Sequence, residues 1–262
     1  MASQESLAQW VYINRHKLSF SAKEFEWARQ NDVPLYDFEV RLTVDGHSGI
    51  GRGSDFDQNT AFSKGFAEAV ERAVCASLNI STIGVAAHTV THLARANARL
   101  EALERYAFDT HIENEQKFIP LRAESTKLFI PGMRFFRMGL PYPYHAVICF
   151  LSNKSESFLG LACDVDSTNA SDKAALEVLR NYAAFQNDPD KFHRTVEKDP
   201  NLWNCRRDFL VDVKNLLGSK EEETSDILLP VVLSERVTTS HLPTLAGCPL
   251  VLERAYLSEA QQ

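Results

Sequence analysis

The pentapeptide Glu68-Ala69-Val70-Glu71-Arg72 returns 33 residues later as Glu101-Ala102-Leu103-Glu104-Arg105. Each copy lies in a segment whose apolar residues follow helical spacing, the first ending near Asn79 and the second running from Val90 to Asp109. A glutamate four residues before an arginine is a common exposed helix pair, which contributes about 0.2–0.5 kcal/mol. A third copy would fall at Arg134–Met138, where the pattern is absent, so the chain is not an array of helical repeats.

The two copies are expected on different faces of their helices. At about 100° per residue, the core face of the first helix holds Phe62, Phe66, Ala69 and Ala73, and the opposite face holds Lys64, Glu68, Glu71 and Cys75. The apolar arc of the second helix holds Leu93, Leu100, Leu103 and Ala107, with Arg95 and Arg99 exposed. Glu104 projects within or beside that arc, where a carboxylate is costly unless it is paired or bound to a metal ion. We therefore expect Arg105 or a metal cation to hold Glu104.

Together the two helices carry four carboxylates. Mg²⁺ prefers hard oxygen ligands and often bridges carboxylates to phosphate oxygens. The candidate magnesium ligands are Glu68, Glu71, Glu101 and Glu104. Guanidinium groups hold phosphates through paired N–H donors, and Arg72 and Arg105 directly follow the two acidic pairs. The pattern therefore indicates a site for a metal ion and a phosphate group.

The flanking segments alternate between strand and helix patterns. Tyr36–Val44 alternates apolar and polar residues as a half-buried strand does, and the following Asp45-Gly46 is a hairpin turn signal. The chain returns through Gly51-Arg52-Gly53, and Ser54 or Asp57 is expected to cap the first helix. The other expected elements are a strand at Ser81–Ala87, a hairpin of His145–Leu151 with Phe158–Cys163, helices at Ser171–Gln186 and near Phe209–Leu217, and closing strands at Ile227–Leu233 and Leu250–Tyr256. We predict an α+β fold in which helices cover a mixed or antiparallel sheet, with residues 1–262 forming a single domain.

The composition narrows the class of protein. Lys and Arg number 28 against 35 Asp and Glu, and the net charge of −7 disfavours general nucleic-acid binding. The 44 % of hydrophobic residues argues against long disorder, while apolar runs such as Ala146–Leu151 are far shorter than the roughly 20 residues that a bilayer requires. The five cysteines form no C-x-x-C pair, which disfavours a disulfide framework, and carboxylates near Cys75 are expected to raise the pKa of its thiol. The start MASQESLAQW shows no signal-peptide pattern, so we expect a cytoplasmic protein.

The order of these motifs resembles the YcaO family. The shared pattern is Gly-x-Gly, an E-x-x-E-R helix, a Gly-x-Ala-Ala-His segment, a second E-x-x-E-R helix, and a third strand and helix. In this chain the matching segments are Gly51–Gly53, Glu68–Arg72, Gly84–His88, Glu101–Arg105, Gly160–Cys163 and Ala174–Glu177. The resemblance covers about residues 34 to 186 and leaves residues 187–262 as a C-terminal part with the closing strands.

The resemblance implies an ATP-binding fold unrelated to P-loops and an enzyme that tailors ribosomally made peptides (RiPP biosynthesis). It implies that the four glutamates hold Mg²⁺ and that ATP is bound by Arg72, Arg105, Asn97, Lys64, Glu177 and Arg180. The implied reaction phosphorylates the oxygen of a peptide backbone amide and then gives an azoline by cyclodehydration, a thioamide or an amidine. The implied partners are a precursor peptide, a leader-peptide-binding or sulfur-delivery protein, and a second copy in a homodimer. No catalytic side chain is assigned.

A catalytically inactive YcaO-like protein that binds a precursor peptide or a partner protein is the alternative. Lys64 stands where the family often has serine, and Leu93 stands where an acidic residue precedes the second motif. The segment between the two motifs is also shorter than the family usually has. These differences favour binding without turnover.

Two further residue groups are candidate sites. Four aromatic residues lie near two arginines, a combination that suits core packing or the binding of a peptide or a base; they are Phe135, Phe136, Tyr142 and Tyr144, with Arg134 and Arg137. His88 and His92 have the spacing of zinc ligands on a helix. No glutamate follows His88, so the metalloprotease pattern H-E-x-x-H is absent.

Overall fold

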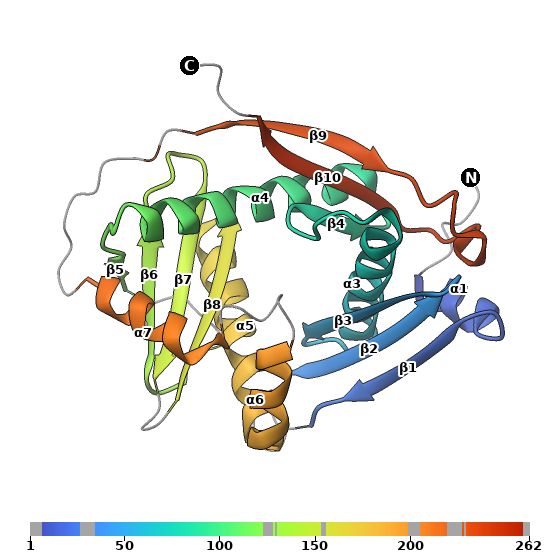
Figure 1. Cartoon of the computed structure of the whole chain (residues 1–262), viewed down its shortest axis with the longest axis horizontal. Helices are drawn as coiled ribbons and strands as arrows, with labels where there is room; N and C mark the ends of the chain where they lie inside the picture. Colours follow the sequence, from blue (N-terminus) through green and yellow to red (C-terminus); the bar gives the residue numbers. More distant parts are fainter. Residues whose placement is uncertain are drawn as a thin grey trace. The chain divides into compact units, whose positions relative to one another are not determined.

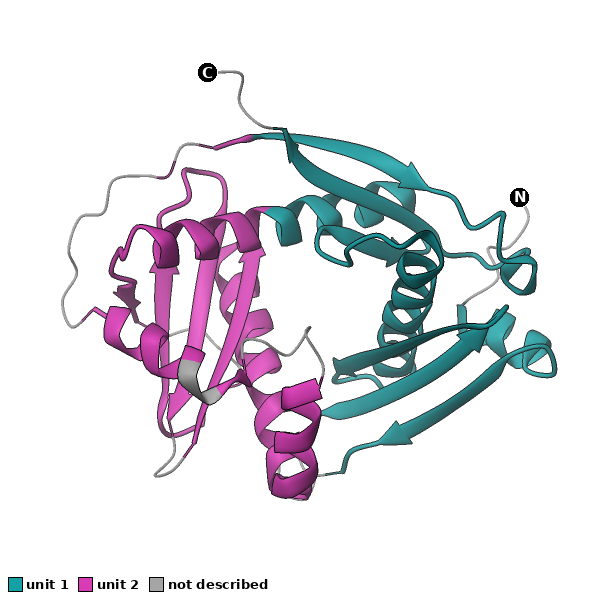
Figure 2. Cartoon of the chain, in the orientation of Figure 1, with its two compact units in different colours: residues 1–102, 231–262 teal, residues 103–230 magenta. Residues whose placement is uncertain are grey.

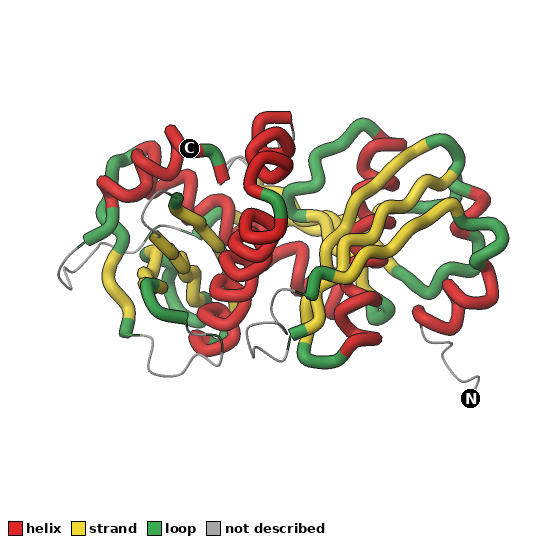
Figure 3. The backbone as a smooth tube through the Cα atoms, turned by 90° about the horizontal axis from the view of Figure 1, so that it is seen from below, coloured by secondary structure: helices red, strands yellow, loops and turns green. Residues whose placement is uncertain are grey.

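The computed structural model describes residues 7–26, 35–122, 128, 130–152, 156–198, 205–218, 227 and 229–258. The chain separates into two compact units: unit 1 comprises residues 1–102 and 231–262, and unit 2 comprises residues 103–230 (Figure 2). Helices and strands occur in both units (red and yellow in Figure 3), so the predicted α+β class is confirmed. Among the described helices, none combines the length and the apolar composition that a membrane crossing needs.

The first sheet of unit 1 is an antiparallel meander in the order β1-β2-β3 (Figure 1). Its strands are β1 (Ser19–Glu24), β2 (Tyr36–Val44) and β3 (His47–Asp55). Asp45 and Gly46 join β2 to β3 with φ angles of 47° and 84°, the two positive values that a tight type I′ hairpin turn requires. The predicted strand at Tyr36–Val44 and the turn after it are therefore confirmed.

Helix α3 (Gln58–Leu78) begins directly after this hairpin and lies against β3. The side chain of Asp57 accepts the backbone N–H of Thr60 at 2.8 Å, so Asp57 rather than Ser54 is the cap. A Cβ atom at Gly49, Gly51 or Gly53 would lie 2.0–2.1 Å from a backbone oxygen of α3. The glycines therefore let the helix approach the strand closely, and the Gly-x-Gly pattern is a packing requirement in this chain.

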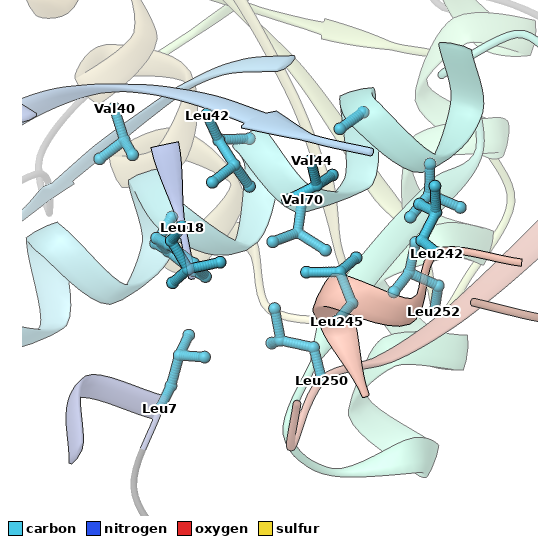
Figure 4. Close-up of a cluster of buried hydrophobic side chains, with 14 of the residues drawn as sticks. Leu7, Leu18, Val40, Leu42, Val44, Val70, Leu242, Leu245, Leu250 and Leu252 are labelled. Atoms are coloured by element: carbon cyan, nitrogen blue, oxygen red, sulfur yellow. The ribbon is translucent and has the colours of Figure 1, made fainter. Parts of the chain in front are cut away.

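The second sheet of unit 1 has the order β4-β10-β9 and is antiparallel. Its strands are β4 (Val85–His88), β9 (Val231–Val237) and β10 (Val251–Ser258), while α1 (Leu7–Asn14) and the short 3₁₀ helix η2 (Pro243–Leu245) complete the unit. Figure 4 shows the apolar core that joins these parts, with Leu7, Leu18, Val40, Leu42, Val44, Val70, Leu242, Leu245, Leu250 and Leu252. Segments from both ends of the chain thus build the core of one unit.

Helix α4 (Thr91–Glu113) begins in unit 1 and ends in unit 2. Unit 2 contains an antiparallel sheet in the order β5-β6-β7-β8, with β5 (Ile119–Leu121), β6 (Met133–Met138), β7 (His145–Ser152) and β8 (Ser157–Asp164). Helix α5 (Ser167–Asn187) covers β7 and β8, and α6 (Pro189–Lys198) and α7 (Arg207–Leu216) follow. The predicted hairpin of β7 and β8 is confirmed.

The hairpin and helix of unit 2 repeat the hairpin and helix of unit 1 at an offset of 109 residues. Tyr36 pairs with Asp55 in the first hairpin, and His145 pairs with Asp164 in the second, so the registers are the same. Asp166 caps α5 as Asp57 caps α3, in each case accepting a backbone N–H at 2.8 Å. A Cβ at Gly160 would likewise lie 2.1 Å from a backbone oxygen of α5.

Several predicted boundaries were wrong, for identifiable reasons. Helix α5 starts four residues earlier than predicted, at Ser167, because Asp166 provides its cap. The strand predicted at Ile227–Leu233 starts only at Val231, directly after Pro230, which has no N–H for a strand ladder. Helix α4 extends to Glu113, where His111 stacks on Phe118 with ring centroids 5.2 Å apart. The unpredicted elements are α1, β1, β5, β6, α6 and η2.

Candidate functional site

The first carboxylate cluster lies within unit 1 and is centred on Glu71 of α3. Burial raises the pKa of Glu71 well above its ordinary range, and the negative charges of Glu101 on α4 and Glu68 on α3 raise it further. Arg72 and the backbone N–H of Ala87 on β4, which donates to Glu71, act in the opposite direction. The two helices therefore bring carboxylates of both motifs together within unit 1.

Glu68 is held against the neighbouring strand. Its carboxylate accepts the backbone N–H of Arg52 at 2.7 Å and the guanidinium Nη2 of Arg72 at 2.5 Å. The Nη1 of Arg72 donates to the backbone oxygen of Ile50 at 2.8 Å. Both side chains are about 30 % exposed. Arg72 is thus positioned by β3 and by Glu68 at the edge of the carboxylate cluster.

A second network supports this strand, and no sequence motif indicates it. The buried carboxylate of Asp37 accepts Nη2 of Arg52 at 2.5 Å, Nε of Arg52 at 3.2 Å and the hydroxyl of Ser54 at 2.8 Å. The guanidinium of Arg52 also lies 4.6 Å from the centroid of the Phe25 ring. This network fixes the stretch of β3 whose backbone N–H holds Glu68.

The second carboxylate cluster lies within unit 2. The pKa of Glu104 on α4 is raised to about 7, chiefly by burial; Arg105 opposes this rise, and Glu177 on α5 adds to it. Nε of Arg105 lies 3.5 Å from a carboxylate oxygen of Glu104, which confirms the expectation that this arginine accompanies Glu104. Glu177 accepts the backbone N–H of Leu161 on β8 at 2.7 Å. Glu104 also accepts a hydrogen bond from the backbone of Cys163.

The two clusters share the 109-residue repeat. Nζ of Lys64 lies 2.6 Å from Asp55, and Nζ of Lys173 lies 2.6 Å from Asp164. The bond from Arg52 N–H to Glu68 corresponds to the bond from Leu161 N–H to Glu177, and both are 2.7 Å long. The copies differ at the next two functional positions, which are Glu71 and Arg72 in unit 1 and Arg180 and Asn181 in unit 2. Only the first copy therefore has a second glutamate on its helix at this point.

The predicted site residues fall into two sets. Unit 1 brings together Glu68, Glu71, Arg72 and Glu101, and unit 2 brings together Glu104, Arg105 and Glu177. Lys64 and Asn97 are exposed, and Arg180 is half-buried on α5. Within the described ranges, no group of three or more His, Cys, Asp or Glu side chains has an arrangement that would hold a metal ion.

Two predicted helix faces were wrong in part. Cys75 is buried rather than exposed, although the pKa of its thiol is raised to about 12 as expected, chiefly by burial and then by Glu71. Leu93 is 40 % exposed, whereas Ala94 and Ala98 are fully buried, so the apolar arc of α4 is rotated from its predicted position. Arg95 is exposed as predicted, and its guanidinium reaches the fully buried Glu253 of β10 at 3.2 Å.

The aromatic residues, arginines and histidines that the sequence singles out as further candidates lie in different surroundings. Phe135 and Phe136 belong to the core, whereas Tyr142, Tyr144 and Arg137 line a cavity in unit 2. Arg134 lies over the rings of Phe136 and Phe150. Nδ1 of His88 accepts the backbone N–H of Val90 at 2.9 Å, and His88 lies at the end of β4 rather than on a helix with His92.

Solved structures of other proteins share this fold. The YcaO protein from Methanopyrus kandleri, in a structure with AMPPCP and Mg²⁺ bound, superposes with a TM-score of 0.63 at 11 % identity over 95 % of this chain and 89 % of that chain. A heterocyclase in complex with substrate and cofactor gives a TM-score of 0.64 at 12 % identity, covering 96 % of this chain and 52 % of that one. A chain of the E. coli microcin synthetase McbBCD complex gives 0.53 at 13 % identity, covering 84 % of each chain.

These similarities are visible in structure alone. No family model matches the sequence, and no curated protein matches it. This chain spans about half the length of the heterocyclase that it resembles. The chain has the YcaO fold, as the order of its motifs predicts.

Proposed function

We propose that this chain binds ATP with Mg²⁺ and uses it to activate a backbone amide of a ribosomally made peptide. The observation that carries the proposal is the half-buried Glu71 beside Glu68 and Glu101. The proposal also rests on the fold, which this chain shares with a YcaO protein whose structure holds AMPPCP and Mg²⁺. Glu104 and Glu177 form a second carboxylate pair, within unit 2.

Carboxylate oxygens are the type of ligand that a hard divalent cation takes. Burying carboxylates next to one another is costly unless their charge is neutralised. The raised pKa values of Glu71 and Glu104 mean that protons neutralise them readily in the metal-free protein. Mg²⁺ takes oxygen ligands and binds deprotonated carboxylates, so it competes with those protons for the same oxygens. We assign Glu68, Glu71, Glu101 and Glu104 as the ligands.

The basic residues have donors left for phosphate oxygens. An arginine has five N–H donors and a lysine has three. In the described part of the chain, Arg72 uses two of its donors on Ile50 and Glu68, and Lys64 uses one on Asp55. Arg72 and Lys64 are therefore oriented by intramolecular bonds and retain donors for the nucleotide. We assign Arg105, Asn97, Glu177 and Arg180 to the same nucleotide site.

The proposed reaction converts an amide oxygen into a leaving group. ATP supplies the phosphoryl group, and the amide oxygen leaves as phosphate. Closure by a Cys, Ser or Thr side chain gives an azoline, sulfide gives a thioamide, and an amine gives an amidine. The chain's own residues supply positioning and charge neutralisation, which are the main requirements of phosphoryl transfer. A precursor peptide is the proposed substrate, with a partner protein or a second copy of the chain completing the assembly.

Titration calorimetry with ATP and Mg²⁺ tests the nucleotide site. The comparison uses wild type, Glu71→Gln, Glu104→Gln and the control Glu113→Gln, which changes an exposed glutamate at the end of α4. We expect binding that depends on Mg²⁺, at least tenfold weaker in the first two variants and unchanged in the control. Absence of binding by wild type, or equal binding by all four proteins, would contradict the proposal.

Binding of a precursor peptide or partner without turnover is the second candidate. It is favoured by Lys64, which stands where the family often has serine, and by the exposed Leu93, which stands where the family has an acidic residue. Phosphate release in the presence of a short peptide encoded beside the gene distinguishes the two functions. Release that stops in Glu71→Gln excludes the inactive protein, whereas peptide binding without release excludes the enzyme.

A further inference from the structure

A cavity of about 270 Å³ opens at the end of the sheet of unit 2, outside both carboxylate clusters. Its wall is formed by the last residues of β6, the turn from β6 to β7, the first residues of β7 and the first residue of α5. The polar side chains that line it are Arg137, Tyr142, Tyr144, His145 and Ser167. Leu140, Ala146 and other apolar residues complete the lining.

The polar side chains of this cavity are uncommitted within the part of the chain that the structure describes. Within the described residues, none of the five makes a hydrogen bond or an ion pair through its side chain. Tyr142 is 89 % exposed, although burying a tyrosine ring is favourable. The other exposed arginine of β6, Arg134, differs because it covers the rings of Phe136 and Phe150. An uncommitted guanidinium beside tyrosines is typical of recognition surfaces, where Arg and Tyr are enriched.

The turn that carries the tyrosines is held by backbone hydrogen bonds. The N–H of Tyr144 donates to the oxygen of Pro141 at 3.1 Å, and the N–H of Leu140 donates to Met138 at 2.8 Å. The N–H of Ile227 donates to the oxygen of Gly139 at 2.7 Å. These bonds keep the wall of the cavity in one conformation, which lowers the entropic cost of binding.

We propose that this cavity binds a carboxylate-bearing segment of an extended peptide, with Arg137 as the anion receptor. Arginine pairs with a carboxylate through two parallel N–H bonds, and the tyrosine rings cover the apolar stem of the bound residue. The cavity is smaller than the about 300–1,000 Å³ of sites that enclose a whole small molecule, so it suits one or two side chains rather than a nucleotide. The nearby acids are already engaged, Asp164 by Lys173 and Asp166 by the N–H of Asn169.

The position of the cavity indicates which class of peptide is the substrate of the proposed reaction. This step rests on the proposed function. Arg137 pairs with Val147, and Val147 pairs with Ala162, which directly follows Leu161, whose N–H holds Glu177. The two spacings between these three neighbouring strands amount to about 10 Å. A peptide anchored at Arg137 therefore reaches the carboxylate cluster of unit 2 with about three extended residues. We infer that the substrate carries an acidic residue three or four positions from the modified one.

Fluorine NMR on the full chain, labelled with 3-fluorotyrosine, tests the proposal. Tyr142→Phe and Tyr144→Phe assign two of the seven tyrosine signals. The probes are the capped peptide acetyl-GEAACG-amide, its glutamine counterpart acetyl-GQAACG-amide, and ATP with Mg²⁺. We expect both signals to shift with the glutamate peptide and at least tenfold weaker binding of the glutamine peptide. Arg137→Gln should weaken binding at least tenfold, and the matched Arg134→Gln should leave it unchanged.

Three outcomes overturn the proposal: no shift with the glutamate peptide, equal affinity for the two peptides, or equal binding by Arg137→Gln and wild type. Shifts produced only by ATP with Mg²⁺ also overturn it, because the cavity would then serve the nucleotide. The result is independent of the calorimetry on Glu71 and Glu104. Peptide binding without nucleotide binding contradicts the proposed enzyme and supports the peptide site. Nucleotide binding without peptide binding contradicts the peptide site and leaves the proposed nucleotide site supported.

Discussion

Glu68 and Glu177 occupy equivalent positions 109 residues apart, and each carboxylate accepts a strand N–H at 2.7 Å. The donors, Arg52 and Leu161, each follow a glycine that lets the helix approach the strand. A carboxylate that accepts a strand N–H fixes the position of its helix along that strand. The repeat therefore places one such acid in each unit, near the Glu71 cluster in unit 1 and the Glu104 pair in unit 2.

Glu177→Ala is expected to destabilise the fold by about 1–3 kcal/mol, because it leaves the N–H of Leu161 without its acceptor. Glu177→Gln keeps an oxygen acceptor at the same place and should recover most of the loss. Urea unfolding of the three proteins measures the difference. If both variants lose the same stability, the negative charge rather than the hydrogen bond is what Glu177 contributes to the fold.

Gly51→Ala is expected to cost roughly 3 kcal/mol or more, because the new Cβ would lie 2.1 Å from the backbone oxygen of Gly65 and overpack the contact. Gly46→Ala provides the control. Gly46 has a positive φ of 84° but no atom within 4 Å of a new Cβ, so only the backbone strain of about 1–2 kcal/mol applies. Thermal unfolding should rank wild type above Gly46→Ala and Gly46→Ala above Gly51→Ala. Equal losses would show that α3 moves away from β3 at little cost.

His111 is expected to contribute to the pH dependence of stability. Burial lowers the pKa of its imidazole, which stacks on Phe118 in unit 2. The unfolded chain therefore binds a proton at a higher pH than the folded chain does. Stability from this group is complete above the ordinary pKa of 6.5 and is lost as the pH falls below it.

His111→Phe keeps a ring beside Phe118 and removes the titration. Its stability should fall less than that of wild type between pH 8 and pH 5, as measured by urea unfolding. His16→Gln, which changes an exposed histidine, should follow wild type. A variant at His111 that loses as much stability in acid as wild type would assign the acid sensitivity to other groups.

How much of the structure the sequence predicts depends on how far apart along the chain the interacting residues lie. The alternation of Tyr36–Val44 and the cap at Asp57 are local, and both were predicted. The bond from Arg52 to Glu68 requires α3 to lie on β3, which no spacing within either segment reveals. The buried Cys75 shows the same limit, because its helical face is covered by residues distant in the sequence.

The 109-residue repeat did leave a signal in the sequence, although a weak one. The segments 51–68 and 160–177 share a glycine, two aspartates, a lysine and a glutamate at matching positions. These are the residues of the close approach, the cap, the ion pair and the strand bond. Of the apolar positions between them, only Ala61 and Ala170 match; the others differ, because many side chains of suitable size fill a core.

Glu71→Gln separates a binding role from a structural role by the sign of its effect on stability. When it is deprotonated, Glu71 in the metal-free wild type places a third negative charge beside Glu68 and Glu101, which the raised pKa shows to be unfavourable. Glutamine removes this charge and can still accept the N–H of Ala87. The stability of the metal-free variant relative to wild type should therefore rise with pH, and this gain should shrink as the pH falls and wild-type Glu71 takes up a proton. ATP with Mg²⁺ should raise the Tm of wild type more than that of the variant. A glutamate kept only for the fold would instead show a loss of stability in the metal-free variant and an unchanged shift with nucleotide.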